Sequence, residues 1–204
     1  MRVAGLLLAY LIGSTPFAFF AGRLLKGVDL RQFGSGNLGA TNVYRTLGAP
    51  AAIAVLLLDA AKGAVPVLIF PVFTGDTATI WWPVTFGMMA ILGHVRPYFG
   101  AFKGGGKGVA TASGVFAALA PLPFLASFVT FVAVVAITRF VSLGSMLGAV
   151  ALSITVLLLQ GPAAPLSLVS VLITAFVIWT HRANIGRLRR GEESKIGRAR
   201  SPTA

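Results

Sequence analysis

Two glycine-rich segments of this chain have the composition of loops that bind phosphate. The first, residues 34–45, reads GSGNLGATNVYR. Small residues let the backbone approach a ligand closely, and successive backbone N–H groups can form a concavity for anionic oxygens. Its side-chain hydrogen-bond donors are Ser35, Asn37, Thr41 and Asn42. Arg45 can hold a phosphate or carboxylate through two hydrogen bonds. The pattern is equally typical of a glycine-rich turn followed by a capped helix.

The second segment, residues 93–108, reads GHVRPYFGAFKGGGKG and leads into an apolar run. Glycines and lysines directly before a helix are typical of phosphate sites at helix N-termini. The candidate ligands are Gly104, Gly105, Gly106, Lys107 and Gly108. A nucleotide P-loop is excluded, because Ala101 and Gly108 occupy the positions of its first glycine and its hydroxyl residue. The alternative is a flexible basic loop.

A third polar segment, residues 181–197, follows the last apolar run and is rich in arginine. Such a stretch is typical of cytoplasmic anchoring and of contact with anionic lipid. His181 and Asn184 differ from the arginines, because a spacing of three predicts that they share one helix face directed toward the membrane.

Asp59 and Lys62 lie inside an apolar segment, also three residues apart. A charge in mid-membrane costs about 2.5–3.5 kcal/mol, so such residues usually face a bundle interior and pair. We therefore predict a structural ion pair, with a substrate role for Lys62 as the second interpretation. His94 is compatible with a hydrogen-bonded loop histidine.

The elements that must position these residues are membrane helices. Of 204 residues, 56% are hydrophobic and only 11% charged, whereas a soluble domain has about 25% charged residues. The absence of cysteine excludes disulfides, thiol nucleophiles and Cys-ligated metals. Carboxylates and histidines are too few and scattered to predict a metal site. The net charge of +12 lies in gaps between apolar runs, which indicates topology or anionic ligands rather than nucleic acid.

The apolar segments predict an all-α, polytopic membrane helix bundle of one domain, residues 1–204. They lie at about 3–22, 51–73, 78–93, 109–120, 122–138, 142–160 and 164–180. Seven crossings with the N-terminus outside and the C-terminus cytoplasmic place every Lys and Arg except Arg2 and Lys62 on the inside. Five crossings are the alternative, if the short segments do not span.

Read in order, these motifs resemble the bacterial acyl-phosphate:glycerol-3-phosphate acyltransferases. The resemblance covers nearly the whole chain. It runs through GSGNLGATNV at 34–43, DAAKG at 59–63, GH at 93–94, KGVAT at 107–111, VSL at 141–143, HRANI at 181–185 and ESKIG at 193–197. Two departures stand out: the family's Gly-Gly-Lys-Gly loop has a third glycine here, and Ala183 stands where the family often has Glu.

The resemblance implies a seven-helix enzyme of the bacterial inner (cytoplasmic) membrane whose active site faces the cytoplasm. It would transfer a fatty acyl group from acyl phosphate to the 1-hydroxyl of glycerol 3-phosphate, giving lysophosphatidic acid and phosphate, the first acylation of phospholipid synthesis. No cofactor or metal is implied. The His-x4-Asp pair of thioester-dependent acyltransferases is missing. The implied partners are the two substrates and membrane lipid, with transient contact to the enzyme that makes acyl phosphate as a further option.

The resemblance also implies roles for individual residues. The implied catalytic residues are Ser35, Asn37, Arg45, Lys107, His181 and Asn184. The implied substrate-binding residues are Ser142, Gly104, Gly105, Gly106, Gly108, Thr41, Asn42 and Lys62. Arg45 and Lys107 would bind phosphates, and His181 would act as general base or orient a substrate while a substrate phosphate takes the proton. Glu193 is expected to be structural, tying the tail to a basic loop.

Two other classes of protein share some of these features. A transporter for a phosphorylated anion would explain the bundle and the cationic loops, but it predicts repeats and broken helices at the midplane. A lipid-binding scaffold needs only the basic tail. The clustering of motifs at one membrane face favours the enzyme.

Overall fold

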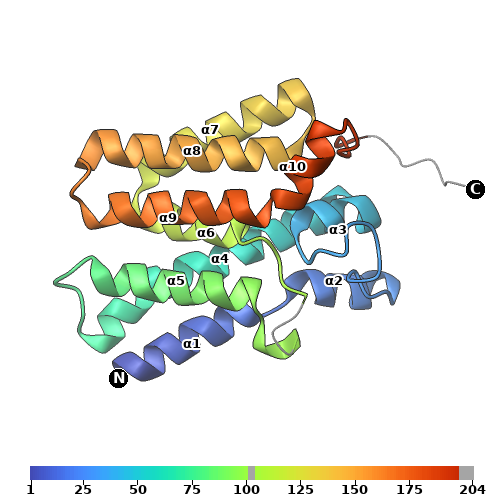
Figure 1. Ribbon diagram of the computed structural model, residues 1–204. Helices are drawn as coiled ribbons and strands as arrows, with labels where there is room; N and C mark the ends of the chain where they lie inside the picture. Colours follow the sequence, from blue (N-terminus) through green and yellow to red (C-terminus); the bar gives the residue numbers. More distant parts are fainter. Residues whose placement is uncertain (101–103, 198–204) are drawn as a thin grey trace, which may run out of the picture. The chain divides into compact units, whose positions relative to one another are not determined.

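A computed structural model describes residues 1–100 and 104–197, which form ten α-helices and one 3-10 helix, with no β-strand in these two ranges (Figure 1). The chain divides into two compact units, Met1–Pro121 and Leu122–Ala204. The interpretation of the chain as a single domain stays a prediction.

The first unit contains the helices α1 to α6. Their bounds are α1 Arg2–Ser14, α2 Phe17–Lys26, α3 Ala40–Leu47, α4 Ala49–Thr74, α5 Trp81–Val95, the 3-10 helix η1 Tyr98–Gly100 and α6 Val109–Leu119. The second unit contains α7 Pro121–Thr138, α8 Val141–Gln160, α9 Pro165–Thr180 and α10 Arg182–Arg189. Each of the seven predicted apolar segments is therefore helical.

The first apolar segment differs from the prediction because it is two helices rather than one. The chain leaves helical geometry at Thr15 and Pro16, between α1 and α2. Proline lacks a backbone N–H, and its ring disfavours the helical conformation of the preceding residue. The break directs α2 and the loop after it toward the glycine-rich loops described below.

Glycine brings the helices of the first unit into close contact. α1 packs along α5, and α4 packs along α6. A Cβ atom on Gly13 would overlap the backbone of Ala90, and a Cβ on Gly114 would overlap the carbonyl of Ala60. Small residues at such crossings are how helices associate in lipid, where no hydrophobic driving force exists between them.

Polar contacts join α8 to α9 in the second unit. The hydroxyls of Ser153 and Thr174 lie 2.7 Å apart, and the Thr174 hydroxyl also donates to the carbonyl of Ala149 at 2.7 Å. Hydroxyl groups that bond across helices are a common means of association in membrane bundles.

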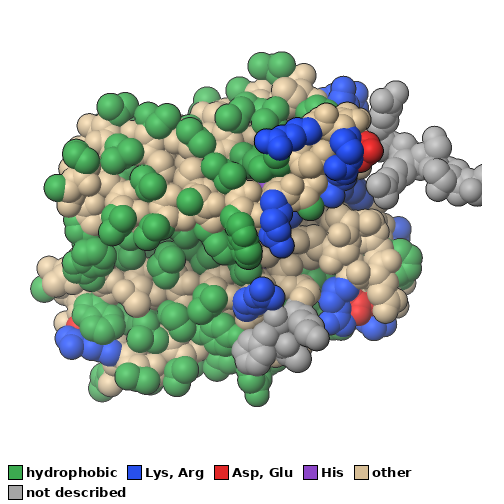
Figure 2. Space-filling model, in the orientation of Figure 1, with side chains coloured by type: hydrophobic (Ala, Val, Ile, Leu, Met, Phe, Trp, Pro, Cys, Tyr) green, Lys and Arg blue, Asp and Glu red, His purple; other side chains and the backbone are tan. Residues whose placement is uncertain are grey.

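Four helical segments of the described chain are long and apolar enough to cross a membrane. They are Arg2–Lys26, Ala49–Thr74, Pro121–Thr138 and Val141–Gln160. A fifth arises if α9 and α10, which meet at 56°, form one span. Figure 2 shows hydrophobic side chains over much of the visible face, and Lys and Arg gathered at the α10 end of the second unit. The molecule is thus a helical membrane protein.

Candidate active site

The glycine loop, residues 104–108, is fixed by backbone conformation and by close packing. Gly104 and Gly108 have φ of 74° and 83°, in the left-handed region that favours glycine. A Cβ on Gly105 would overlap the carbonyls at the end of α5, and a Cβ on Gly106 would overlap the ring of His94. Side chains at positions 105 and 106 would collide with these neighbours, which gives a steric reason for the additional glycine of this loop. Gly108 is the N-cap residue of α6.

The loop after α2 lies against the glycine loop. A Cβ on Gly104 would lie 2.8 Å from Cδ of Arg31, and one on Gly106 would lie 3.0 Å from the carbonyl oxygen of Leu38. The structure thus brings together the two glycine-rich segments, with contact between Leu38 and Gly106, which lie 68 positions apart in the sequence.

Asn42 shapes the first segment from within. Its side chain is buried, its amide nitrogen donates to the carbonyls of Leu30 at 3.1 Å and Phe33 at 3.0 Å, and its amide oxygen accepts from the Ser35 N–H at 2.9 Å. Both amide donors of Asn42 therefore bind its own loop. The substrate-binding role of Asn42 stays a prediction, and in that role Asn42 would act by fixing the conformation of this loop.

The other predicted residues of this segment are more accessible. Ser35 and Arg45 are exposed, and Asn37 and Thr41 are half-buried. Arg45 lies in the last turn of α3. The segment thus presents hydroxyl, amide and guanidinium groups around a turn that Asn42 holds in shape.

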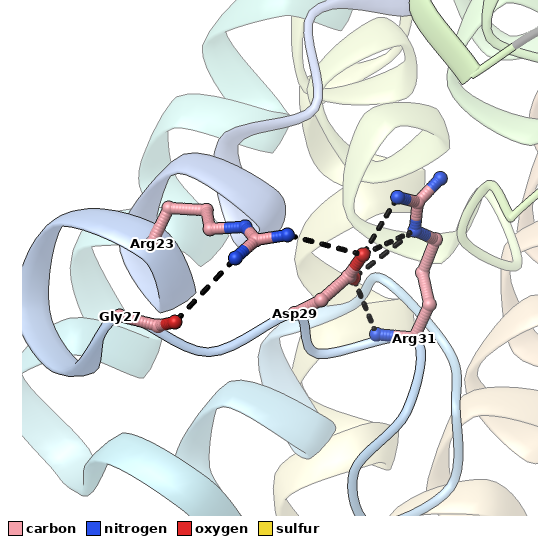
Figure 3. A network of polar contacts seen from close by, with 4 residues as sticks. All are labelled: Arg23, Gly27, Asp29 and Arg31. Carbon is pink, nitrogen blue, oxygen red and sulfur yellow. Dashed lines mark hydrogen bonds and ion pairs between the residues drawn. The ribbon is translucent and has the colours of Figure 1, made fainter.

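A carboxylate at the same end of the unit orients Arg31. Asp29 accepts hydrogen bonds from the backbone N–H of Arg31 at 3.0 Å and from its Nη2 at 2.6 Å, and Arg23 lies 3.9 Å away (Figure 3). These hydrogen bonds from Arg31 hold the pKa of Asp29 below its usual value, against the effect of burial. This network was not predicted from the sequence, although a lone aspartate among basic residues is a local signal for it.

Asp59 and Lys62 form the predicted ion pair. Lys62 Nζ lies 2.7 Å from Asp59 Oδ1 and donates to the carbonyl of Thr15 at 2.9 Å, and His94 Nδ1 lies 3.6 Å from the same carboxylate oxygen. All three charged or polar side chains are buried. Because His94 closes α5, the pair lies at the level where α5 ends and the glycine loop begins. The substrate role of Lys62 stays a prediction.

Two adjoining clefts open beside the glycine loop. The first is a small recess of about 10 Å³, room for about one water molecule. It is lined by Ser14, Thr15, Pro16, Phe17, Leu38, Asp59, Lys62, His94, Pro97, Gly105 and Gly106. The second, an apolar cleft of about 240 Å³, is lined by Pro16, Phe19, Phe20, Arg31, Leu38, Pro97 and Phe99. The shared walls, Pro16, Leu38 and Pro97, make the two clefts neighbours.

In the second unit, Glu193 connects α8 with α10. One carboxylate oxygen accepts from Ser142 Oγ at 2.8 Å and from Asn184 Nδ2 at 2.6 Å, and the other accepts from Arg187 Nε at 2.7 Å. Burial raises the pKa of Glu193, but the three hydrogen bonds outweigh it and the net shift is downward. Glu193 is structural as predicted, but it binds these helices rather than a basic loop.

His181 lies where α9 passes into α10. Its ring Nδ1 is 2.8 Å from the carbonyl oxygen of Val177, and the side chain is 3% exposed. His181 is the N-cap residue of α10, and its carbonyl oxygen accepts the Ile185 N–H at 2.9 Å, so His181 and Asn184 both belong to the start of α10, after the 56° bend. That they share one face directed toward the membrane stays a prediction. Both are buried.

No group of three or more His, Cys, Asp or Glu side chains within residues 1–100 and 104–197 is placed to hold a metal ion.

Comparison with known proteins identifies the family. Residues 3–191 match the sequence profile of the glycerol-3-phosphate acyltransferases. An enzyme of this name from Listeria monocytogenes is 46% identical over 190 residues, covering 93% of this chain and 94% of that protein. Glycerol-3-phosphate acyltransferase 2 of Bacillus anthracis is 44% identical over 196 residues, covering 96% and 100%.

Solved structures agree with the sequence comparison. The crystal structure of PlsY (YgiH), an integral membrane glycerol 3-phosphate acyltransferase, in its glycerol 3-phosphate form has a TM-score of 0.85 and 38% identity, and covers 96% of both chains. A crystal structure of PlsY in its lysophosphatidic acid form has the same TM-score and identity and covers 96% and 95%. The chain therefore belongs to the glycerol-3-phosphate acyltransferase family of integral membrane proteins.

Proposed function

We propose that this protein transfers a fatty acyl group from acyl phosphate to the 1-hydroxyl of glycerol 3-phosphate. The hydroxyl oxygen attacks the acyl carbonyl carbon, the bond between that carbon and the phosphate oxygen breaks, and the hydroxyl proton leaves with a base. The products are lysophosphatidic acid and inorganic phosphate. Acyl phosphate is an activated mixed anhydride, so no covalent enzyme intermediate is required.

The observation that carries this proposal is the glycine loop at the start of α6. Left-handed glycines at positions 104 and 108 bracket a short turn whose backbone leads into the helix N-terminus, and Lys107 lies within it. A helix N-terminus carries partial positive charge and directs N–H groups outward, so it suits a phosphate. Membership of the family and the glycerol 3-phosphate form of PlsY support glycerol 3-phosphate as the ligand.

Catalysis then depends on positioning and on electrostatic stabilisation. Both substrates are anions and phosphate is the leaving group, so cationic and N–H groups must hold two anions together and stabilise the carbonyl oxygen. We assign phosphate binding to Arg45 and Lys107 and hydrogen bonding to Ser35 and Asn37. The apolar cleft beside the loop accommodates an acyl chain.

We assign to His181 the role of general base. A carbonyl oxygen can only accept, so the contact with Val177 makes Nδ1 the protonated nitrogen of the neutral ring. Nε2 is then the nitrogen that accepts a proton, and histidine titrates near neutral pH. The alternative is that His181 orients a substrate and a substrate phosphate takes the proton. If kcat of the His181→Gln variant still falls at low pH as in the wild type, the result supports this alternative.

The donor is tested by acyl transfer with purified protein. Palmitoyl phosphate and palmitoyl-CoA are compared as donors to labelled glycerol 3-phosphate, with Lys107→Ala in parallel. We expect labelled lysophosphatidic acid from palmitoyl phosphate only, and its loss in the variant. Product from the thioester would overturn the donor, and no product from either donor in folded protein would overturn the reaction.

We also propose seven crossings, with the N-terminus outside and the active site facing the cytoplasm of a bacterial inner membrane. Support comes from the direction of α5. Near the start of α1, Arg2 pairs at 2.6 Å with Asp76, which precedes α5. Toward the end of α1, the Tyr10 hydroxyl donates to the carbonyl of Arg96, which follows α5. α5 therefore runs parallel to α1 and crosses if α1 does, although its 15 residues span only about 22 Å.

The chain contains no cysteine, so single introduced cysteines report topology directly. Phe99→Cys decides between seven and five crossings, because it is cytoplasmic only if α5 crosses and α6 returns. Ala163→Cys is the outside control and Ala183→Cys the inside control. We expect a membrane-impermeant maleimide to label position 163 in intact cells, and positions 99 and 183 only after permeabilisation. Labelling of position 99 in intact cells would contradict the seven-helix topology.

A further inference from the structure

Three buried side chains form a continuous polar chain across the first unit, from Lys62 through Asp59 to His94. They are 5%, 2% and 6% exposed, with contacts of 2.7 Å between Lys62 Nζ and Asp59 Oδ1 and 3.6 Å between that oxygen and His94 Nδ1. Burying charges costs several kcal/mol each, and well-packed apolar residues often serve stability equally well. Packing alone therefore does not account for this cluster.

The series of polar side chains ends, at His94, beside the glycine loop. The backbone carbonyl of His94 accepts the Gly106 N–H at 3.2 Å, and the other ring nitrogen, Nε2, faces the Cα of Gly106 so closely that a Cβ would overlap it. His94 thus contacts Gly106 through both its backbone and its ring. The other end of this series is Lys62, which donates to the carbonyl of Thr15 at the break between α1 and α2.

We propose that Asp59 and His94 are positioning residues that set the glycine loop for binding the phosphate of glycerol 3-phosphate. The Asp59 carboxylate lies beside Nδ1 of the His94 ring and limits its orientation, and the ring and carbonyl of His94 fix Gly106. Lys62 neutralises the carboxylate and ties it to a second part of the bundle. Helices α1, α4 and α5 thereby fix the loop. This inference rests on the proposed function of the loop.

The test separates positioning from folding through Michaelis constants. In Asp59→Asn and His94→Ala, we expect the KM for glycerol 3-phosphate to rise about 10- to 100-fold, because displacement of a binding loop by about 1 Å costs that much. The KM for palmitoyl phosphate should change less than about threefold. The matched control is Asp76→Asn, which removes another buried, ion-paired aspartate at the opposite end of the same unit. It should leave both KM values unchanged.

A double-mutant cycle tests the contact between ring and loop. Gly106→Ala alone should raise the KM for glycerol 3-phosphate, because its Cβ collides with the His94 ring. In the His94→Ala background the collision with the ring is gone and only the 3.0 Å approach to the Leu38 carbonyl oxygen remains, so the added alanine should have a much smaller effect. Strong coupling supports positioning, whereas two effects that multiply overturn it, because residues without contact behave additively.

The outcomes remain distinguishable if a variant folds poorly. If His94→Ala cannot be purified as folded protein, His94→Gln and Asp59→Asn carry the comparison, with hydrogen exchange of the peptide containing Gly106 as the second readout. Faster exchange in the variants together with a raised KM for glycerol 3-phosphate supports the inference. Unchanged KM in folded variants, or an equal rise in both KM values, overturns it. Wild-type protein without activity toward palmitoyl phosphate would instead refute the proposed function.

Discussion

Replacing Glu193 by glutamine should destabilise the second unit and free two predicted active-site residues. The carboxylate is 8% exposed and accepts hydrogen bonds from Ser142, Asn184 and Arg187. Glutamine has the same shape but only one acceptor oxygen. Whichever way its amide is placed, an NH₂ group must face a donor that the carboxylate satisfied.

The magnitude follows from the burial of each partner. If the amide oxygen stays with Ser142 and Asn184, the lost partner is Arg187, whose side chain is 36% exposed, so the loss is about 1 kcal/mol plus the cost of facing an NH₂. If the oxygen turns to Arg187, the two buried bonds are disturbed, each worth about 1.5–3 kcal/mol because the acceptor is charged. We therefore expect a loss of about 2–4 kcal/mol, which lowers the melting temperature by roughly 4–16 °C for a chain of this size.

Thermal unfolding in detergent micelles at pH 7 measures this effect. Glu192→Gln is the control, because Glu192 pairs with Arg190 at the surface, where the two side chains are 55% and 59% exposed. The control should change stability by less than about 1 kcal/mol. Equal melting temperatures of Glu193→Gln and Glu192→Gln would refute the reasoning that Glu193 holds α8 to α10.

Three further predictions concern the first unit. Lys62→Met should lower the free energy of unfolding by about 3–5 kcal/mol, because it leaves Asp59 buried without its partner. The double variant Lys62→Met, Asp59→Asn should be more stable than Lys62→Met alone; melting temperatures that show additive losses would contradict the buried pair. Gly114→Val should cost about 1–3 kcal/mol by forcing α6 from α4, and an unchanged melting temperature would contradict the close crossing. Asp29→Asn should cost about 1 kcal/mol at most, because Arg31 is partly exposed. Since Arg31 lowers the pKa of Asp29 in the folded state, this stability is present above pH of about 3.9 and is lost as pH falls through the lower folded value. A difference between wild type and Asp29→Asn that persists at still lower pH would contradict this assignment.

The helices could be predicted from the sequence because lipid imposes a simple rule. Any chain segment in hydrocarbon must satisfy its own backbone, so an apolar run becomes a helix. All seven apolar runs are helical for this reason. The break at Pro16 was not predicted, although proline is a local signal for the end of a helix. The short helices α3 and α10 were harder, because polar segments of eight residues carry little periodic signal.

The site was predictable only where its contacts are local in sequence. The ion pair of Asp59 and Lys62 was found because the two residues stand one helical turn apart. The contact of Asp59 with His94, and that of Glu193 with Ser142 across 51 positions, depend on tertiary packing that no local pattern reveals. Likewise, nothing in the sequence predicted the 56° bend between α9 and α10, at which His181 lies.

The distribution of carboxylates narrows the identity of the catalytic base. The chain has only five Asp and Glu residues, and all lie in the described ranges. Each forms an ion pair; the five are Asp29, Asp59, Asp76, Glu192 and Glu193. A general base works best with a pKa near the operating pH, and an ion-paired carboxylate is held in its charged, weakly basic form. Each carboxylate thus serves to orient a cation or tie two segments. We infer that the hydroxyl proton of glycerol 3-phosphate passes to Nε2 of His181 or to a substrate phosphate, and not to a carboxylate. Loss of the acid limb of the kcat profile in His181→Gln would assign the proton to the histidine.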